Sequence, residues 1–362
     1  MSHSSRGMSL IEILVGLAIG MIGVLVIFQT MAVWGARTAT TISGGDARTT
    51  GAIAMYYLER DLQQGGLGFG MSSAIGTQFK PGCAITSGGT NFLLSAATIV
   101  EGANADGGHN ISGDPDQLTV LYAGSTDSNV NFTDVALFEQ DKTTPGGAYS
   151  YQGPALLRNV RVILANSGTC ELNQVNRTDQ PTLNGITFST PPGITQGSLM
   201  SLGTAPQRAT WRIDSNRLVR EESVFSTVAS EIADGVVDLQ AEYGFVDKAG
   251  VWTWTASSPP ASAPPNAQWA QLRAVKVAIL VRSKQFEKPG NDGAVATPDA
   301  NVPVWHSGSG ADVKFRMKNI DGATGALATC PCAPDTNDWH QYRYEVFERV
   351  IPLRNLIWGA QS

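Results

Sequence analysis

One long apolar stretch dominates the N-terminal part of the chain. Residues 8–34 are apolar or small, and the stretch is interrupted only by Ser9, Glu12, Gln29 and Thr30. At 1.5 Å per residue this stretch spans about 40 Å as a helix, which is long enough to cross a bilayer. It is too long for the apolar core of an ordinary secretory signal, which covers roughly 7–15 residues. We therefore predict a membrane-length helix at the N-terminus.

An amphipathic pattern follows directly and extends the predicted helix to residue 65. Its apolar positions recur at helical spacing, while polar residues fill the other face. The apolar positions are Ala47, Ile53, Ala54, Tyr57, Leu58 and Leu62, and the polar ones are Glu59, Arg60, Asp61 and Gln63. Gly44 and Gly45 mark a weak point within this helix. The glycine-rich run at residues 65–70 predicts a flexible stop.

From residue 71 onward, short segments alternate with a period of two between polar loops. Residues 117–122, 273–282 and 342–351 read as strands, and residues 210–221 as a hairpin that turns at 214–216. A sheet packed on the second half of the helix would bury these alternating faces. The predicted fold class is therefore α+β, with a long N-terminal helix packed on a large antiparallel β-rich head.

Glu12 is the unusual residue of the apolar stretch. A carboxylate inside a membrane span costs about 2.5–3.5 kcal/mol on insertion scales, so it usually marks function. Gly16, Gly20 and Gly23 follow Glu12 at intervals of four, four and three residues and share its helical face. Glycine is common in membrane helices generally, but such a stripe also lets another helix approach closely. Because a buried charge is tolerated only when it is paired, we expect this face to pack against protein.

The N-terminal motif resembles the processing and assembly signal of type IV prepilins. It reads Arg6-Gly7-Met8-Ser9-Leu10-Ile11-Glu12. The resemblance implies that prepilin peptidase cuts after Gly7 and that Met8, where the class usually has phenylalanine, becomes the N-methylated first residue. It also implies that Glu12 is the acid that meets the N-terminal amine of a neighbouring subunit. The expected division is a leader peptide at 1–7, a transmembrane and filament-core helix at 8–34, its amphipathic continuation at 35–65, and a β-rich globular head at 66–362.

Three blocks of the body, residues 231–240, 272–283 and 350–358, resemble the PilW-type minor pilins. The resemblance implies a structural subunit that helps prime type IV pilus assembly at or near the tip and supports twitching motility and adhesion. The implied partners are other minor pilins, the major pilin, prepilin peptidase, the inner-membrane assembly platform and a large tip adhesin. The implied location is the bacterial inner membrane, with the head in the periplasm, and then the pilus on the cell surface.

Two alternatives stay open: a minor pseudopilin of type II secretion, and a membrane-anchored periplasmic binding protein or enzyme. For the second, no catalytic residue, cofactor or nucleophile elbow is nominated by the sequence. A net charge of −6 without a basic run argues against nucleic acid as the main partner. The segment beginning at Asp127 starts like a calcium loop but has Phe132 and Phe138 where glycine and glutamate are required, so we expect a solvated turn.

The cysteines predict disulfide bonds rather than a metal site. Four cysteines allow three pairings, which the sequence leaves open. We favour Cys83 with Cys170 and a tight loop between Cys330 and Cys332. A zinc site using the last two cysteines and His340 has neither the usual spacing nor a fourth ligand.

Three tryptophans, Trp252, Trp254 and Trp269, flank a proline-rich loop. They could form an exposed patch, but buried aromatic packing is the commoner arrangement and is the one we expect.

Overall fold

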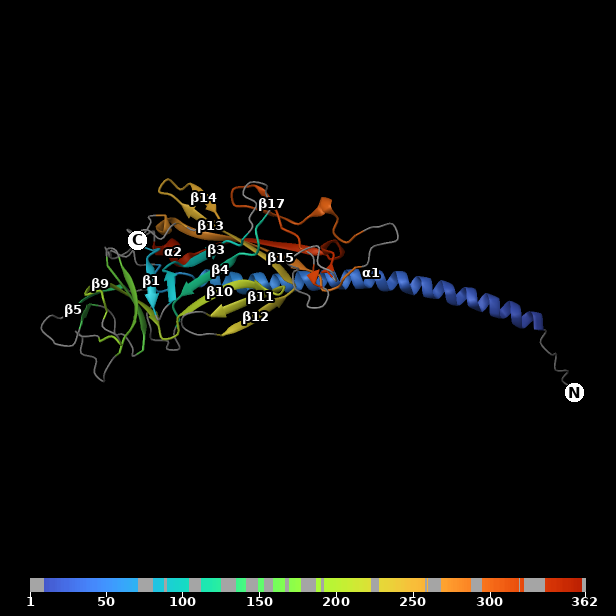
Figure 1. Ribbon diagram of the computed structural model, residues 1–362, viewed down its shortest axis with the longest axis horizontal. Coiled ribbons are helices and arrows are strands. Elements are labelled where there is room, and N and C mark those ends of the chain that lie inside the picture. Colours follow the sequence, from blue (N-terminus) through green and yellow to red (C-terminus); the bar gives the residue numbers. More distant parts are fainter. Residues whose placement is uncertain are drawn as a thin grey trace.

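The computed structural model (Figure 1) describes most of the chain. The described residues are 10–70, 81–87, 90–103, 112–124, 135–140, 149–152, 159–166, 169–176, 187–189, 192–222, 228–257, 259, 268–287, 295–318, 320–321 and 336–359. The leader residues, residues 127–134 of the calcium-like segment, and Cys330 and Cys332 lie outside these ranges, whereas Phe138, at the end of that segment, lies in a strand, β5 (Val135–Gln140).

The N-terminal helix α1 runs without interruption over Leu10–Gln64, 55 residues. Gly44 and Gly45 do not break it. Its first half projects from the body as a single helix, with the N-terminus at the far end (Figure 1). The part from Leu10 to Met31, 22 residues, is long and apolar enough to cross a membrane, and none of it is buried in the protein. Its apolar side chains therefore need a membrane or another protein to cover them.

Two antiparallel sheets hold the second half of α1. The four-stranded sheet has the order β14 (Trp252–Thr255), β13 (Val236–Val246), β15 (Leu272–Arg282), β20 (Tyr344–Pro352). A five-stranded sheet has the order β12 (Ala229–Asp234), β11 (Arg217–Glu222), β10 (Gln207–Asp214), β4 (Gln117–Tyr122), β3 (Ala97–Val100).

The remaining elements complete the body around these two sheets. A second five-stranded sheet, at the end of the body away from the projecting helix (Figure 1), has the order β6 (Tyr149–Gln152), β5 (Val135–Gln140), β9 (Gln196–Gly203), β7 (Arg161–Ala165), β8 (Cys170–Gln174). Three hairpins pair β1 (Ala84–Ser87) with β2 (Thr90–Leu93), β16 (Val304–His306) with β17 (Asp312–Lys314), and β18 (Ile320–Asp321) with β19 (Thr336–Asn337). The short helices are η2 (Trp269–Gln271), η3 (Asp299–Asn301), η4 (Trp339–Gln341) and α2 (Arg354–Gly359).

The main core lies between α1 and both of its sheets. Ala54, Leu58 and Leu62 of α1 are fully buried in one cluster with residues of β4, β10, β13 and β15. The α+β prediction, a long helix packed on a large antiparallel β-rich body, is confirmed. The strand predicted at 117–122 is β4, and those at 273–282 and 342–351 correspond to β15 and β20. The predicted hairpin joins β10 to β11 through Ser215 and Asn216, whose positive φ values of 52° and 61° suit a type I′ turn.

The buried face of α1 differs from the predicted one. Ile53 and Tyr57 are 46% and 43% exposed, whereas Asp61 is only 8% exposed. Asp61 enters the interior because partners on the sheet hold its carboxylate, and a hydrophobicity pattern contains no information about those partners.

The glycine run after α1 also differs from the flexible stop that we expected. A Cβ at Gly65 would lie 2.9 Å from the Ala96 carbonyl oxygen, and one at Gly68 would lie 2.6 Å from that of Ser201. Gly66 and Gly68 have φ values of +83° and +92°. The run is thus a tightly packed turn that only glycine can form.

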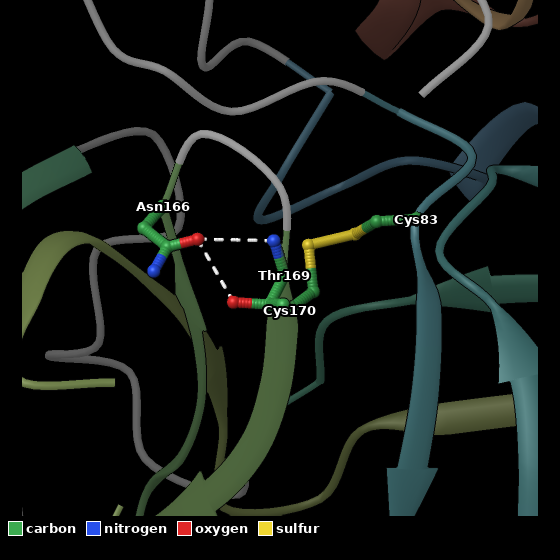
Figure 2. The surroundings of a disulfide bond; sticks show 4 residues. All are labelled: Cys83, Asn166, Thr169 and Cys170. Carbon is green, nitrogen blue, oxygen red and sulfur yellow. Dashed lines mark hydrogen bonds between the residues drawn. A yellow bond between two sulfur atoms is a disulfide. The ribbon is translucent and has the colours of Figure 1, made fainter. Parts of the chain in front are cut away.

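The structure has a disulfide bond between Cys83 and Cys170, the first of the two favoured pairings. Cys83 directly precedes β1 and Cys170 begins β8. The bond therefore ties the β1–β2 hairpin to the sheet β6-β5-β9-β7-β8, here called the distal sheet (Figure 2). Beside it, the Asn166 Oδ1 accepts hydrogen bonds from the amide and hydroxyl of Thr169, at 3.0 and 2.8 Å, which closes the turn that leads into β8.

The three tryptophans do not share one environment. Trp269 is buried against Tyr243 and Phe245, as expected. Trp252, in contrast, is 49% exposed and stacks on the half-buried Trp254. The expectation of buried packing is therefore wrong for Trp252, because its edge strand directs it to the outer face of the sheet.

Candidate functional site

The stripe predicted on the N-terminal helix is present on the projecting half of α1. Glu12 lies in the first turn, and Gly16, Gly20 and Gly23 follow on the same face, within an arc of about 80° at 100° per residue. A Cβ added at any of the three glycines would meet nothing within 4 Å. The stripe is therefore an uncovered surface of this chain, shaped for close approach by another helix. Gly7 and Met8 lie outside the described residues.

The same helix is fixed to the body by ion pairs along β20. Arg48 of α1 donates to Glu345 at 2.7 Å. Further along α1, Glu59 accepts from Arg349. Phe347 lies between them on the strand and packs directly against Gly51, where a Cβ would come within 2.0 Å of the ring. Because residues 345, 347 and 349 alternate along the strand, they all face the helix.

A polar network around Asp61 attaches α1 to the other sheet. Its carboxylate accepts hydrogen bonds from Arg220 Nε at 2.6 Å and from Trp211 Nε1 at 3.2 Å. Tyr122 donates to the other carboxylate oxygen at 3.3 Å, and burial raises the pKa of this phenol to about 12. Arg220 also pairs with Glu222 at 3.1 Å. The charges are thus paired and hydrogen-bonded, which is the condition for burying them.

The C-terminal helix α2 caps the end of α1. The Asn355 side-chain amide donates to the carbonyl oxygens of Gln64 and Gly65, at 3.1 and 3.2 Å. Carbonyl groups at a helix end have no partner within the helix, and here Asn355 supplies one to both, while the Gln64 oxygen also accepts from the Leu67 amide at 3.0 Å. Sequence reasoning missed Gly51, Asp61, Arg220 and Asn355. The blocks at 231–240, 272–283 and 350–358 were the nearest signal, since they form strands and the cap of this anchor.

A cavity of about 600 Å³ opens where α1 leaves the body. Its lining includes Gly44, Arg48, Thr297, Pro303 and Glu345. The cavity adjoins the first ion pair of the anchor.

Two carboxyl groups are buried between β13 and the segment before β4. Asp116 accepts from the amides of Gly102 and Ala241, at 2.9 and 2.8 Å, and Asp238 accepts from Gln240 Nε2 at 2.8 Å. Burial raises the pKa of Asp116 to about 6 and that of Asp238 to about 7. Nearby carboxylates add to both shifts: those of Glu101 and Glu242 for Asp116, and that of Asp116 for Asp238. These groups join loops to the sheet and make its stability depend on pH.

The described residues contain no cluster of potential metal ligands. Among them, no group of three or more His, Cys, Asp or Glu side chains could hold a metal ion. His306 lies against Glu348, and His340 against Asp338 and Asp299, all near the surface.

Comparison with known families gives two matches. Residues 213–355 match the family model of the type IV pilus-assembly protein W, and residues 2–28 match the prokaryotic N-terminal methylation motif. No curated protein matches the sequence. Among solved structures, a type IV-like pilin from Thermus thermophilus is similar at 14% identity and a TM-score of 0.23, over 55% of this chain and 86% of that one. A likeness that weak carries no argument about function.

The two family matches fall on the two parts that the geometry singles out. The methylation motif covers the leader and the Glu12–glycine stripe, and the other match covers β11 to β20, which hold α1 in the body. The two matches, one to part of the body and one to the N-terminus, together support a PilW-type minor pilin with a prepilin-type N-terminus.

Proposed function

We propose that this protein is a structural subunit that helps prime assembly of the type IV pilus and stands at or near its tip, in support of twitching motility and adhesion. The observation that carries the proposal is the Glu12–glycine stripe on a helix that projects, uncovered, from the body. The family points to a structural role rather than to catalysis.

Processing of the N-terminus comes first in this proposal. The chain enters the inner membrane with its body in the periplasm, prepilin peptidase cuts after Gly7, and Met8 is methylated. The match of residues 2–28 to the methylation motif supports this step. The mature helix then meets the assembly platform, other minor pilins and the major pilin, and a large adhesin at the tip.

Packing of helices supplies the driving force for incorporation. Burying the carboxylate of Glu12 in the membrane costs free energy. This cost falls when the amine of a neighbouring subunit pairs with the carboxylate. The glycines let the partner helix approach until van der Waals contact is extensive. The rigid anchor to both sheets then transmits the position of the helix to the body.

Mass spectrometry of the protein purified from membranes tests the processing step. We expect a chain that begins at Met8 with a methylated amine. An intact leader, or a cut elsewhere, would contradict the prepilin assignment and favour a plain membrane anchor.

Substitution of the stripe tests its role in assembly. Glu12→Ala and Gly20→Leu should insert into the membrane normally but lower incorporation into sheared pili at least tenfold, because one removes the paired charge and the other blocks close packing. Ala18→Leu places the same leucine side chain on the opposite helical face and serves as the matched control. Wild-type piliation and motility in Glu12→Ala would sink the proposed role of this residue.

The runner-up, a minor pseudopilin of type II secretion, shares the N-terminal signal. The match to the pilus-assembly family over 213–355 favours the pilus. Loss of protein secretion with normal pili in a deletion strain would support the runner-up instead.

A further inference from the structure

The outer face of the four-stranded sheet carries a pair of stacked indoles, Trp252 and Trp254, here called the indole platform. Both belong to β14, the edge strand, and because they are two residues apart they lie on the same face. Their ring centroids are 5.4 Å apart and their planes differ by 10°. β14 lies on the side of the body away from β11 and β12 and far from the free end of α1 (Figure 1). The platform therefore stays accessible when α1 is embedded in a membrane.

Two glycines make room for the platform. Gly244 lies opposite Trp254 in the register of β13 and β14, and a Cβ there would lie 2.7 Å from one indole and 3.1 Å from the other. Gly308 packs on the face of Trp254, where a Cβ would lie 2.2 Å from the ring. Glycine inside a strand weakens it, and the register of β13 also shifts beside Gly244. These glycines thus make room for the two stacked rings, although Gly244 weakens β13 locally.

The loop beside the platform is held in place and is polar. Glu242 Oε2 accepts from the Gly308 amide at 2.6 Å, which fixes the β16–β17 turn against Trp254. Ser309, in the same turn, is exposed, and its hydroxyl lies 2.6 Å from that of Ser307. An aromatic surface therefore lies next to hydroxyl, carboxylate and backbone groups that can form hydrogen bonds.

This chemistry suits a neutral sugar better than other ligands. The C–H face of a pyranose is apolar and weakly positive, which complements the negative face of an indole, while the ring hydroxyls need polar neighbours. A nucleic acid could also stack on tryptophan, but it would bring phosphates toward Glu242 in a chain of net charge −6. A protein partner needs about 800 Å² of contact, whereas the neighbouring exposed apolar side chains here are only Val251 and Trp252.

We propose that Trp252 and Trp254 form a carbohydrate-binding platform that stacks on the apolar face of a neutral oligosaccharide, with Ser309 and the β16–β17 turn as hydrogen-bonding neighbours. Trp254 is packed between Gly308 and Trp252, and its ring supports one face of the outer indole. The exposed Trp252 makes the main contact. This site is separate from the Glu12–glycine stripe and does not rest on the proposed role in pilus assembly.

The test is calorimetric titration of the full-length, detergent-solubilised protein with three neutral pentasaccharides: β-1,4-linked glucose, β-1,4-linked N-acetylglucosamine and α-1,4-linked glucose. We expect saturable binding of at least one of them. Trp252→Ala should weaken that binding at least tenfold, and Trp252→Phe, which keeps a smaller ring, should weaken it less. Val251→Ser removes a neighbouring exposed apolar side chain but leaves both indoles, so its affinity should stay within twofold of the wild type.

Several outcomes would overturn the proposal. Absence of binding to all three saccharides by the wild type is one, and equal affinity in Trp252→Ala is another. Binding of a ten-residue oligothymidylate, or self-association, that Trp252→Ala abolishes would assign the platform to nucleic acid or to protein instead. Thermal unfolding of each variant by circular dichroism separates loss of the site from loss of the fold, and Trp252→Phe provides the readout if Trp252→Ala unfolds.

Discussion

At the scale of single residues, the chain places two carboxylates of α1 under opposite conditions. Glu12 lies on the projecting half, where no part of the body covers its stripe, and Asp61 lies in the interior beside Arg220. For the first, we propose a role in assembly with other subunits. The second pairs with Arg220, so its contribution is to the stability of the body.

Asp61→Asn should lower the free energy of unfolding by about 2–3 kcal/mol, because it leaves Arg220 partly buried with only Glu222 to balance it. Chemical denaturation of the purified protein measures the change. The neighbouring Arg60→Gln alters an exposed side chain and should shift stability by no more than about 0.5 kcal/mol. Equal effects of the two substitutions would mean that the network around Asp61 contributes nothing.

The buried carboxyls predict a dependence of stability on pH. Burial raises the pKa of Asp238 to about 7, whereas an unfolded carboxyl titrates near 4. The native state therefore binds more protons than the unfolded state between about pH 4 and pH 7, and stability falls as pH rises through this window. Asp116, with a pKa raised to about 6, acts in the same direction.

Asp238→Asn removes the group that titrates and should make the melting temperature less sensitive to pH between 5 and 8. Differential scanning calorimetry at both pH values measures this difference. Asp234→Asn changes an exposed carboxylate and should keep the wild-type slope. If Asp238→Asn also keeps that slope, the buried carboxyl is not its source.

At the scale of elements, two glycines of α1 lie in different environments. Gly45 has nothing within 4 Å of an added Cβ, whereas Gly51 lies against the ring of Phe347. The first only weakens the helix, while the second allows the helix to approach β20 closely.

Gly51→Ala should therefore destabilise the protein by about 1–3 kcal/mol through overpacking, although alanine favours helix. Gly45→Ala, on the same helix, should instead gain up to about 1 kcal/mol. Thermal melts followed by circular dichroism compare the two directly. Stabilisation by both substitutions would show that Phe347 can move aside at little cost in free energy.

At the scale of the whole molecule, one disulfide bond among the described residues ties the distal sheet to the rest of the body, in addition to the backbone. The disulfide between Cys83 and Cys170 spans 87 residues of sequence, so it removes much freedom from the unfolded chain. The sheet it holds has its own core cluster, separate from the one around α1.

Replacing both cysteines by serine should lower the free energy of unfolding by about 2–4 kcal/mol, measured by denaturant titration. Cys330→Ser with Cys332→Ser leaves this bond intact and should have a smaller effect, since the bond that we predict between these two cysteines would close only a three-residue loop. A larger loss from the second pair would mean that the long-range bond is not the main covalent support.

The long helix, the β-rich body, most of the central strands and the stripe at Glu12 could all be predicted from the sequence. Each of these depends on a local period or on a motif that is contiguous along the chain. The burial of Asp61, the capping of α1 by Asn355, the packing of the glycine run and the exposure of Trp252 could be seen only in the folded protein. Those features depend on contacts such as Asp61 with Arg220, 159 residues apart, and no local pattern specifies which distant group will arrive.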